Sequence, residues 1–146
     1  MIPRHGKSGN LPAGIHEADW RELETAFGGS ARRVALLAGL REALTSLRRA
    51  GCSTAYVDGS FVTANQAPAD FDACRDPKGV VLDALDTVLL DFSEDRRAQK
   101  QRYGGELFPA DVAAEPKGTL FIDFFQLDRH TGARKGIVKI DLEDLA

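Results

Sequence analysis

Apolar residues recur at intervals of three and four between residues 31 and 49, which is the spacing of one face of an α-helix. Ser30 precedes this stretch as a helix N-cap, and Gly51 follows it as a stop. The pattern predicts a long helix whose apolar face lies in the core, formed by Val34, Leu37, Leu40, Leu44 and Leu47. A shorter helix is expected over residues 16–27, where two glycines end it.

Shorter runs of alternating or β-branched residues predict strands. Residues 53–57 and 70–75 are two such runs, separated by a polar loop. Two further apolar runs, at 119–127 and 136–142, flank a polar turn at 128–135. We expect the last two strands to pair as a β-hairpin.

Between these strands the pattern returns to helical spacing. We expect helices over residues 80–92 and 94–103, and a short extended segment around 106–108. These elements predict an α/β (α+β) fold in which helices pack on a mixed β-sheet. Residues 1–29 are expected to form an N-terminal extension with a short helix, and residues 30–146 the main domain.

Length and composition fit a globular chain of this kind, with 146 residues, of which 43% are hydrophobic and 28% charged. The net charge of −3 excludes a small, uniformly basic nucleic-acid binder. The charge is uneven, because residues 1–50 carry a net +3 and residues 51–146 a net −6. An acidic segment of this kind is typical of a metal site, a partner-binding face or a solvated surface.

Several classes are not expected from the sequence. No apolar stretch is long enough to cross a membrane, and no apolar core follows the first basic residues, so neither a membrane helix nor a secretory signal is predicted. Cys52 and Cys74 show no metal-binding spacing, and we expect them to be reduced in a cytoplasmic protein.

A Gly-Ser pair and two spaced aspartates suggest a chemical function. Asp70 and Asp72 lie two apart in a predicted strand, so both carboxylates point to one side. Adjacent carboxylates repel each other unless a cation lies between them, and Mg²⁺ prefers oxygen ligands of this type. Gly59 allows close backbone approach and Ser60 adds a hydroxyl, which favours a phosphate site after the strand at 53–57. The alternatives are a simple turn and a solvated edge strand.

The motif resembles a known superfamily. Val57-Asp58-Gly59-Ser60, followed after nine residues by Asp70-Phe71-Asp72, is similar to the signature of polymerase-beta-like nucleotidyltransferases, and closest to their minimal nucleotidyltransferase branch. The resemblance follows the element order over residues 30–126 and is clear only in residues 57–72. It implies that residues 30–146 form a nucleotidyltransferase-like domain.

A second resemblance concerns other parts of the chain. The runs at 11–16 and 59–63 and the tail at 135–142 are similar to a bacterial family with this core and no defined activity. This resemblance names no substrate.

The superfamily resemblance implies roles for individual residues. Gly59 and Ser60 would hold the phosphates of a nucleoside triphosphate (NTP), and Asp70 and Asp72 would bind Mg²⁺ or Mn²⁺. A third carboxylate on a later strand assists activation of the acceptor hydroxyl in this superfamily. Asp123 is the first choice, because an aspartate among bulky apolar residues on a strand is costly without a partner. The alternatives are Glu106, Asp111 and Asp141.

Two further features bear on the site. Arg129, Arg134 and Lys135 cluster in the predicted turn, where they would bind triphosphate or an RNA acceptor, or form a solvated surface. Asp58 occupies a position that is usually apolar in the superfamily, as a turn-forming residue or as an influence on the metal site.

The predicted function is a metal-dependent transfer of a nucleoside monophosphate from an NTP to a hydroxyl on a protein, an RNA or a small molecule. The superfamily resemblance also suggests a partner in a toxin–antitoxin or phage-defence system. The alternative is an inactive binding module of the same fold that acts as an antitoxin or regulatory partner. A third interpretation is an unrelated α/β domain in which the motif arose by chance.

Overall fold

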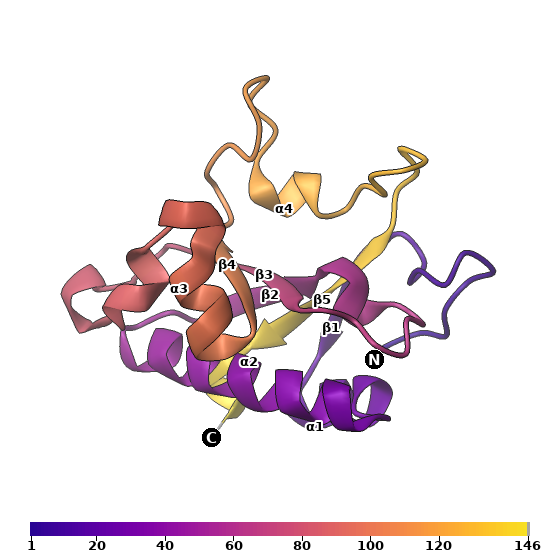
Figure 1. Ribbon diagram of the computed structural model, residues 1–146, viewed down its shortest axis with the longest axis horizontal. Coiled ribbons are helices and arrows are strands. Elements are labelled where there is room, and N and C mark those ends of the chain that lie inside the picture. The colour runs from indigo at the N-terminus through magenta and orange to yellow at the C-terminus, as the bar shows by residue number, and fades with distance from the viewer. Residues whose placement is uncertain (146) are drawn as a thin grey trace.

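The computed structural model describes residues 1–145, which form a five-stranded β-sheet with helices packed against it (Figure 1). The strand order is β1-β5-β2-β3-β4, so the strand nearest the C-terminus lies between the first two. The strands are β1 (Gly14–Ala18), β2 (Thr54–Asp58), β3 (Phe71–Arg75), β4 (Gly105–Pro109) and β5 (Gly136–Asp141).

The sheet is mixed. β1 runs parallel to β5 and β4 runs parallel to β3, whereas β2 is antiparallel to both of its neighbours. This arrangement confirms the predicted α/β (α+β) class with helices packed on a mixed sheet.

Two helices cover one face of the sheet, α1 (Trp20–Phe27) and α2 (Ala31–Arg49) (Figure 1). Asp19 caps α1 by accepting a 2.8 Å hydrogen bond from the Glu22 N–H, and Ser30 caps α2 by accepting one from the Arg33 N–H. The core between the helices and the sheet is apolar. On the strands it contains Ala55, Val57, Phe71, Ala73, Val138 and Ile140.

The long helix was predicted at its observed bounds. Leu37, Leu40, Leu44 and Leu47 are buried as expected, but Val34 is 56% exposed, because Leu36 rather than Val34 faces the core in the first turns. A third helix, α3 (Ser93–Tyr103), packs beside α2 and β4.

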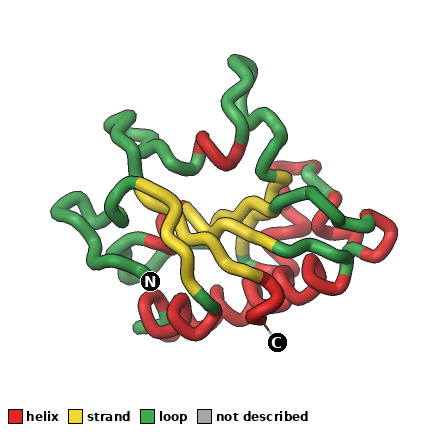
Figure 2. The backbone as a smooth tube through the Cα atoms, turned by 180° about the vertical axis from the view of Figure 1, so that it is seen from behind, coloured by secondary structure: helices red, strands yellow, loops and turns green. Residues whose placement is uncertain are grey.

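The opposite face of the sheet carries a long excursion of the chain. Residues 110–135, here called the α4 arm, connect β4 to β5 on the side away from α2 and contain the short helix α4 (Phe121–Phe124) (Figures 1 and 2). Phe108 of β4 stacks on Phe121 with ring centroids 4.1 Å apart, which anchors the arm to the sheet.

Two predictions in the second half of the chain are wrong. The run at 119–127 is not a strand, because its phenylalanines stack on Phe108 and on one another around a helical turn. The predicted hairpin is also absent, since β5 pairs with β1 and β2, and an isolated bridge links Leu127 to Arg134 within the predicted turn.

Two other elements differ from the prediction. The expected helix at 80–92 is replaced by 3₁₀ turns at Leu82–Ala84 and Thr87–Leu90. Asp86 interrupts the helix, because its side chain accepts hydrogen bonds from the Val88 N–H and the Tyr103 hydroxyl. Near the N-terminus, the predicted helix begins only at Trp20, because the preceding residues form β1.

The first 29 residues contribute to the shared core. β1 pairs with β5, and Leu23 and Phe27 of α1 are buried with the residues of α2. The predicted division at residue 29 stays a prediction. Among residues 1–145, no helix has the length and apolar character needed to cross a membrane.

Candidate functional site

The turn after β2 places backbone directly against a carboxylate. β2 ends at Asp58, and Gly59 follows with a φ of +76°, which residues with a Cβ rarely adopt. A Cβ at Gly59 would collide with the carboxylate of Asp72, whose own Cβ and Cγ lie 3.1 Å from that position. Ser60 is exposed in the same turn. Gly59 therefore lies directly against the Asp72 carboxylate, and the phosphate-binding role of Gly59 and Ser60 stays a prediction.

Three carboxylates lie in a row across neighbouring strands. Asp58 on β2 pairs in register with Asp72 on β3, which pairs with Glu106 on β4. Residues paired in this way share one face of a sheet. This face is opposite α1 and α2, because the alternating neighbours Val57 and Ala73 point into the helix-covered core. We call Asp58, Asp72 and Glu106 the carboxylate row.

Asp70 lies beside the row, immediately before β3. It is half-buried, and burial followed by the negative charge of Glu106 raises its pKa. The positive charges of Lys100 and Arg32 act in the other direction. The charge of Asp70 also raises the pKa of Asp72, so the two aspartates are coupled electrostatically, and their role as metal ligands stays a prediction.

Several neighbouring groups act on Asp72. Burial, the negative charges of Asp70 and Glu106 and a side-chain hydrogen bond with Glu106 raise the pKa of Asp72 from its ordinary value of 3.8 to about 7. The positive charge of Arg129 opposes this shift. Asp72 therefore keeps its proton at pH values where an ordinary aspartate is ionised.

Asp58 is the most isolated member of the row. Its side chain is 0% exposed, and neither carboxylate oxygen has a hydrogen-bond partner among the described residues. Burial and the charge of Asp72 raise the pKa of Asp58 well above its ordinary value, while the charge of Lys135 lowers it. A buried carboxyl without partners is costly, so its oxygens are available to a proton or a cation.

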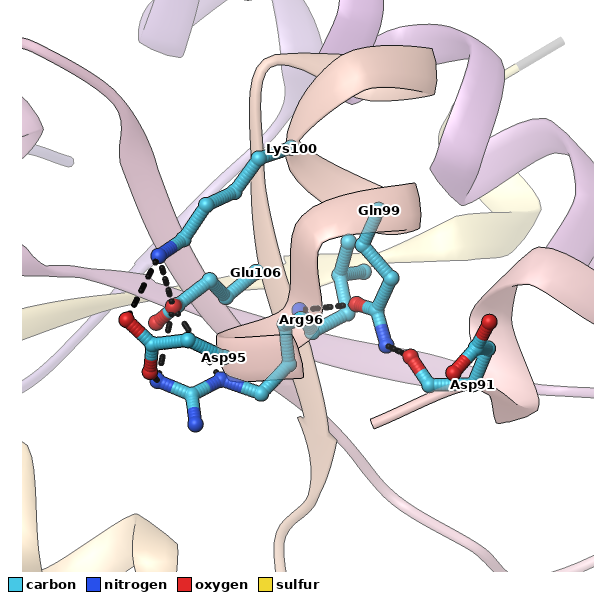
Figure 3. Close-up of polar contacts among 7 residues, drawn as sticks. Asp91, Asp95, Arg96, Gln99, Lys100 and Glu106 are labelled. Atoms are coloured by element: carbon cyan, nitrogen blue, oxygen red, sulfur yellow. Dashed lines mark hydrogen bonds and ion pairs between the residues drawn. The ribbon is translucent and has the colours of Figure 1, made fainter. Parts of the chain in front are cut away.

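Glu106 has the opposite surroundings. One of its oxygens, Oε1, accepts hydrogen bonds from Arg96 (Nε at 3.1 Å and Nη2 at 2.9 Å) and lies 3.1 Å from Nζ of Lys100 (Figure 3). Both cations come from α3. Gln99 fixes this helix to β4 by accepting a 2.8 Å hydrogen bond from the Leu107 N–H and donating to the Asp91 carbonyl.

The α4 arm contributes positive charge from the other side. Arg129 acts on the pKa of Asp72, and Lys135 acts on that of Asp58. Arg134 is exposed beside Lys135, and its role in phosphate binding stays a prediction. Two cations of the predicted cluster, Arg129 and Lys135, thus influence the carboxylate row.

Asp123 lies elsewhere than the sequence suggested. It occupies the short helix α4 with an exposed side chain, and no charge effect links it to Asp70 or Asp72. Glu106, one of the alternatives for the third carboxylate, is the residue paired with Asp72. The signal in the sequence was a lone glutamate in a short extended segment. Arg96 and Lys100 were missed, because nothing local distinguishes them from other helix cations.

The donor set fits a hard divalent cation in its chemistry, since all four groups offer carboxylate oxygens and those of Asp58 lack partners. The side chains are not yet arranged as a metal site. Among residues 1–145, no three His, Cys, Asp or Glu side chains converge closely enough to hold a metal ion. A cation would have to draw these carboxylates together.

Comparison with known proteins gives one result. Residues 3–141 match the sequence profile of a family of unknown function, DUF6932. The chain belongs to this family. The match to DUF6932 covers all five strands, so the carboxylate row lies within the matched region. No curated protein and no solved structure matches the chain.

Proposed function

We propose that this chain is a metal-dependent nucleotidyltransferase that moves a nucleoside monophosphate from an NTP to a hydroxyl acceptor. The observation that carries the proposal is the carboxylate row beside the Gly59-Ser60 turn, because it combines oxygen ligands with backbone that can approach a phosphate. The resemblance of residues 57–72 to the nucleotidyltransferase signature supports the same activity.

The proposed roles follow the positions of the side chains. Asp70, Asp72 and Glu106 would hold Mg²⁺ or Mn²⁺, with Glu106 in the third-carboxylate role first assigned to Asp123. Gly59 and Ser60 would face the phosphates of the NTP. The metal would neutralise charge on the attacking and leaving oxygens.

The reaction is an in-line displacement at phosphorus. The acceptor oxygen forms a bond to the α-phosphorus, the bond from that phosphorus to the bridging oxygen breaks, and pyrophosphate leaves. The proton of the acceptor hydroxyl passes to Glu106, since the third carboxylate assists this step in the superfamily that the motif resembles. The arm cations Arg129 and Lys135 would balance charge on the triphosphate.

The test is incubation of the chain with each labelled NTP, Mg²⁺ or Mn²⁺, and cell extract as a source of protein, RNA and small-molecule acceptors. We expect covalent label on an acceptor with the wild type, and a loss of about a hundredfold or more in Asp72→Asn, the order of effect seen when electrostatic stabilisation is removed. Absence of NTP binding to the wild type by calorimetry would contradict the proposal.

A matched pair of variants distinguishes the two candidates for the third carboxylate. Glu106→Gln should reduce labelling nearly as much as Asp72→Asn, whereas Asp123→Asn should leave it within about threefold of the wild type, because Asp123 is exposed on α4. The opposite result would return the role to Asp123.

A second candidate function is a binding module that holds a phosphate-bearing ligand without turnover, as an antitoxin or regulatory partner. It is favoured by the occupation of Glu106 by two cations, which competes with metal binding. NTP binding without transfer of label, in the presence of every acceptor class, would support this candidate over the enzyme.

A further inference from the structure

Glu106, which is nearly buried, forms ion pairs with two cations, Arg96 and Lys100. The Glu106 side chain is 11% exposed, and the side chains of Arg96 and Lys100 that meet it are 29% and 36% exposed (Figure 3). Asp95 adds a second anion, with Oδ1 2.7 Å from Arg96 Nη2 and Oδ2 3.5 Å from Lys100 Nζ. Asp95 itself is mostly exposed. The charge of Glu106 therefore holds two cations next to the carboxylate row.

The backbone that presents Arg96 is strained. Glu94, Asp95 and Arg96 have φ of 49°, 60° and 58°, so three successive residues with a Cβ adopt the left-handed conformation at the start of α3. Such residues are disfavoured there and persist only where surrounding contacts hold them. Here those contacts include the Arg96–Glu106 and Arg96–Asp95 pairs. Loss of Glu106 as a partner would release the turn.

Lys100 also acts on a second acidic group of the site. Lys100 lowers the pKa of Asp70, so its charge acts on two of the four acidic groups. Asp58 adds an independent sign of a ligand in the same row, because it is 0% exposed and its oxygens lack partners. A divalent cation at the row would compete with Arg96 and Lys100 for Glu106 and would repel both.

We propose that Arg96 and Lys100 are phosphate-binding residues of this site. In the free protein they form ion pairs with Glu106. When a divalent cation binds Glu106, they are released from it and bind the phosphates of the ligand. The proposal rests on the proposed function, and it names polyphosphate as the ligand class. The planar guanidinium of Arg96 matches a phosphate group in two hydrogen bonds, and Lys100 supplies a point charge. With Arg129 and Lys135 on the arm, the ligand would meet cations from two sides of the row.

The test measures two affinities of the full chain by calorimetry, one for Mg²⁺ alone and one for inorganic tripolyphosphate with Mg²⁺. In Lys100→Ala we expect Mg²⁺ to bind several-fold more tightly, because a competitor for Glu106 is gone. Tripolyphosphate should bind about tenfold more weakly, the size of one charge-assisted hydrogen bond. Arg96→Ala should shift both affinities in the same directions, and Lys100→Arg should restore the tripolyphosphate affinity.

Arg97→Ala is the matched control, since Arg97 lies on the same helix, is 67% exposed and faces only Glu94 at 3.6 Å. It removes the same charge and should leave both affinities unchanged. If Arg97→Ala changes them as much as Lys100→Ala does, the effect is general electrostatics and the inference is wrong. The Lys100 side chain is 36% exposed, so we expect Lys100→Ala to fold. If Arg96→Ala fails to fold, Lys100→Ala still tests the inference.

A second readout follows the strained turn. Addition of Mg²⁺ alone should speed amide hydrogen exchange at residues 93–97 in the wild type, and Asp72→Asn should abolish this response. If Mg²⁺ binds through Asp72 while Lys100→Ala retains wild-type tripolyphosphate affinity, the inference fails and the proposed function stands. If Mg²⁺ does not bind the wild type, both fail.

Discussion

The two ends of β2 both gather acidic side chains, but they differ in almost every physical respect. Near Thr54, where β2 begins, a groove of about 590 Å³ is lined by Glu17, Asp19, Glu22, Asp141, Glu143 and Asp144. Near Asp58, where β2 ends, the carboxylate row crosses the sheet. The groove contains more carboxylates, yet the row is the candidate site.

The difference lies in how the oxygens are satisfied. In the groove, Asp19 caps α1, Asp141 accepts a 3.0 Å hydrogen bond from the Glu143 N–H, and Glu17 lies 3.5 Å from Lys139. Except for the half-buried Glu22, these acids are exposed, so water screens their charges. In the row, burial removes that screening and Asp58 has no partner. The number of carboxylates is thus a poor guide to a site, and their unsatisfied burial is a better one.

The largest expected effect concerns pH. The unfolded chain loses the Asp72 proton near pH 3.8, whereas the folded protein retains it to about pH 7, so folding stability should fall as pH rises through this window. The contribution of Asp72 to the slope should be about 1.4 kcal/mol per pH unit, and the raised pKa of Asp58 adds to it with the same sign. Urea unfolding of the metal-free protein between pH 5 and 7.5 measures it.

Variants at the two ends of β2 sharpen the pH experiment. Asp72→Asn should reduce this slope without abolishing it, because the raised pKa of Asp58 also favours the protonated folded state, while Asp141→Asn in the groove should leave the slope unchanged. A slope that is not reduced in Asp72→Asn would mean that Asp72 does not titrate as its burial requires. If Asp72→Asn and Asp141→Asn changed the pH dependence of stability equally, the carboxylate row and the groove would not differ in how their acids titrate.

The second effect concerns the glycine that lies against the row. Gly59→Ala should destabilise the fold by about 2 kcal/mol or more, because it combines an unfavourable φ with a collision against Asp72. Gly132→Ala is the control, since Gly132 has a similar φ of +73° and open space around it. Thermal unfolding of both variants separates the cost of the collision from the cost of the positive φ. An equal loss of stability in the two variants would contradict the close packing at Gly59.

The third effect has the opposite sign. Asp58→Asn should stabilise the metal-free protein at pH 7.5 by about 1–2 kcal/mol, since it removes a buried acid that has no partner. The same variant should weaken Mg²⁺ binding if Asp58 supports the site. Measured together, chemical unfolding and calorimetry would reveal this exchange of stability for binding, and a destabilised variant would argue that Asp58 has a partner in solution.

The smallest effect is expected in the groove. Glu17→Gln should change the free energy of unfolding by less than about 0.5 kcal/mol, because the Glu17–Lys139 pair is exposed and screened. Chemical unfolding at low and high salt checks this expectation. A larger loss that disappears in high salt would indicate that the groove is more than a solvated surface.

The sequence predicts the part of the molecule that local chemistry decides. The helix α2 has an N-cap at Ser30 and an apolar face of leucines in its sequence, and it forms where expected. The Gly59 turn lies between two runs with strand character, and it also appears where expected. The run around Phe121 was ambiguous, because short apolar runs fit a strand or a helical turn equally well. The helical turn places Phe121 against Phe108, a contact between two elements that the local pattern does not contain.

The candidate site was predictable only in part for the same reason. Gly59, Asp70 and Asp72 are close in the sequence, and their spacing carries the signal. Glu106 joins Asp72 through the pairing of β3 with β4, which a single sequence does not reveal. Placing the third carboxylate on Asp123 depended on a strand that does not form.

The position of β5 in the sheet also determines when the fold can be completed. The strand that pairs with β1 is β5, more than 110 residues further along the chain. During synthesis, β2, β3 and β4 can assemble early, while β1 waits with unpaired backbone until β5 inserts between it and β2. Such late, long-range closure slows folding and exposes strand edges. We therefore expect the edges of β1 and β2 that pair with β5 to stay exposed in a growing chain until β5 is available.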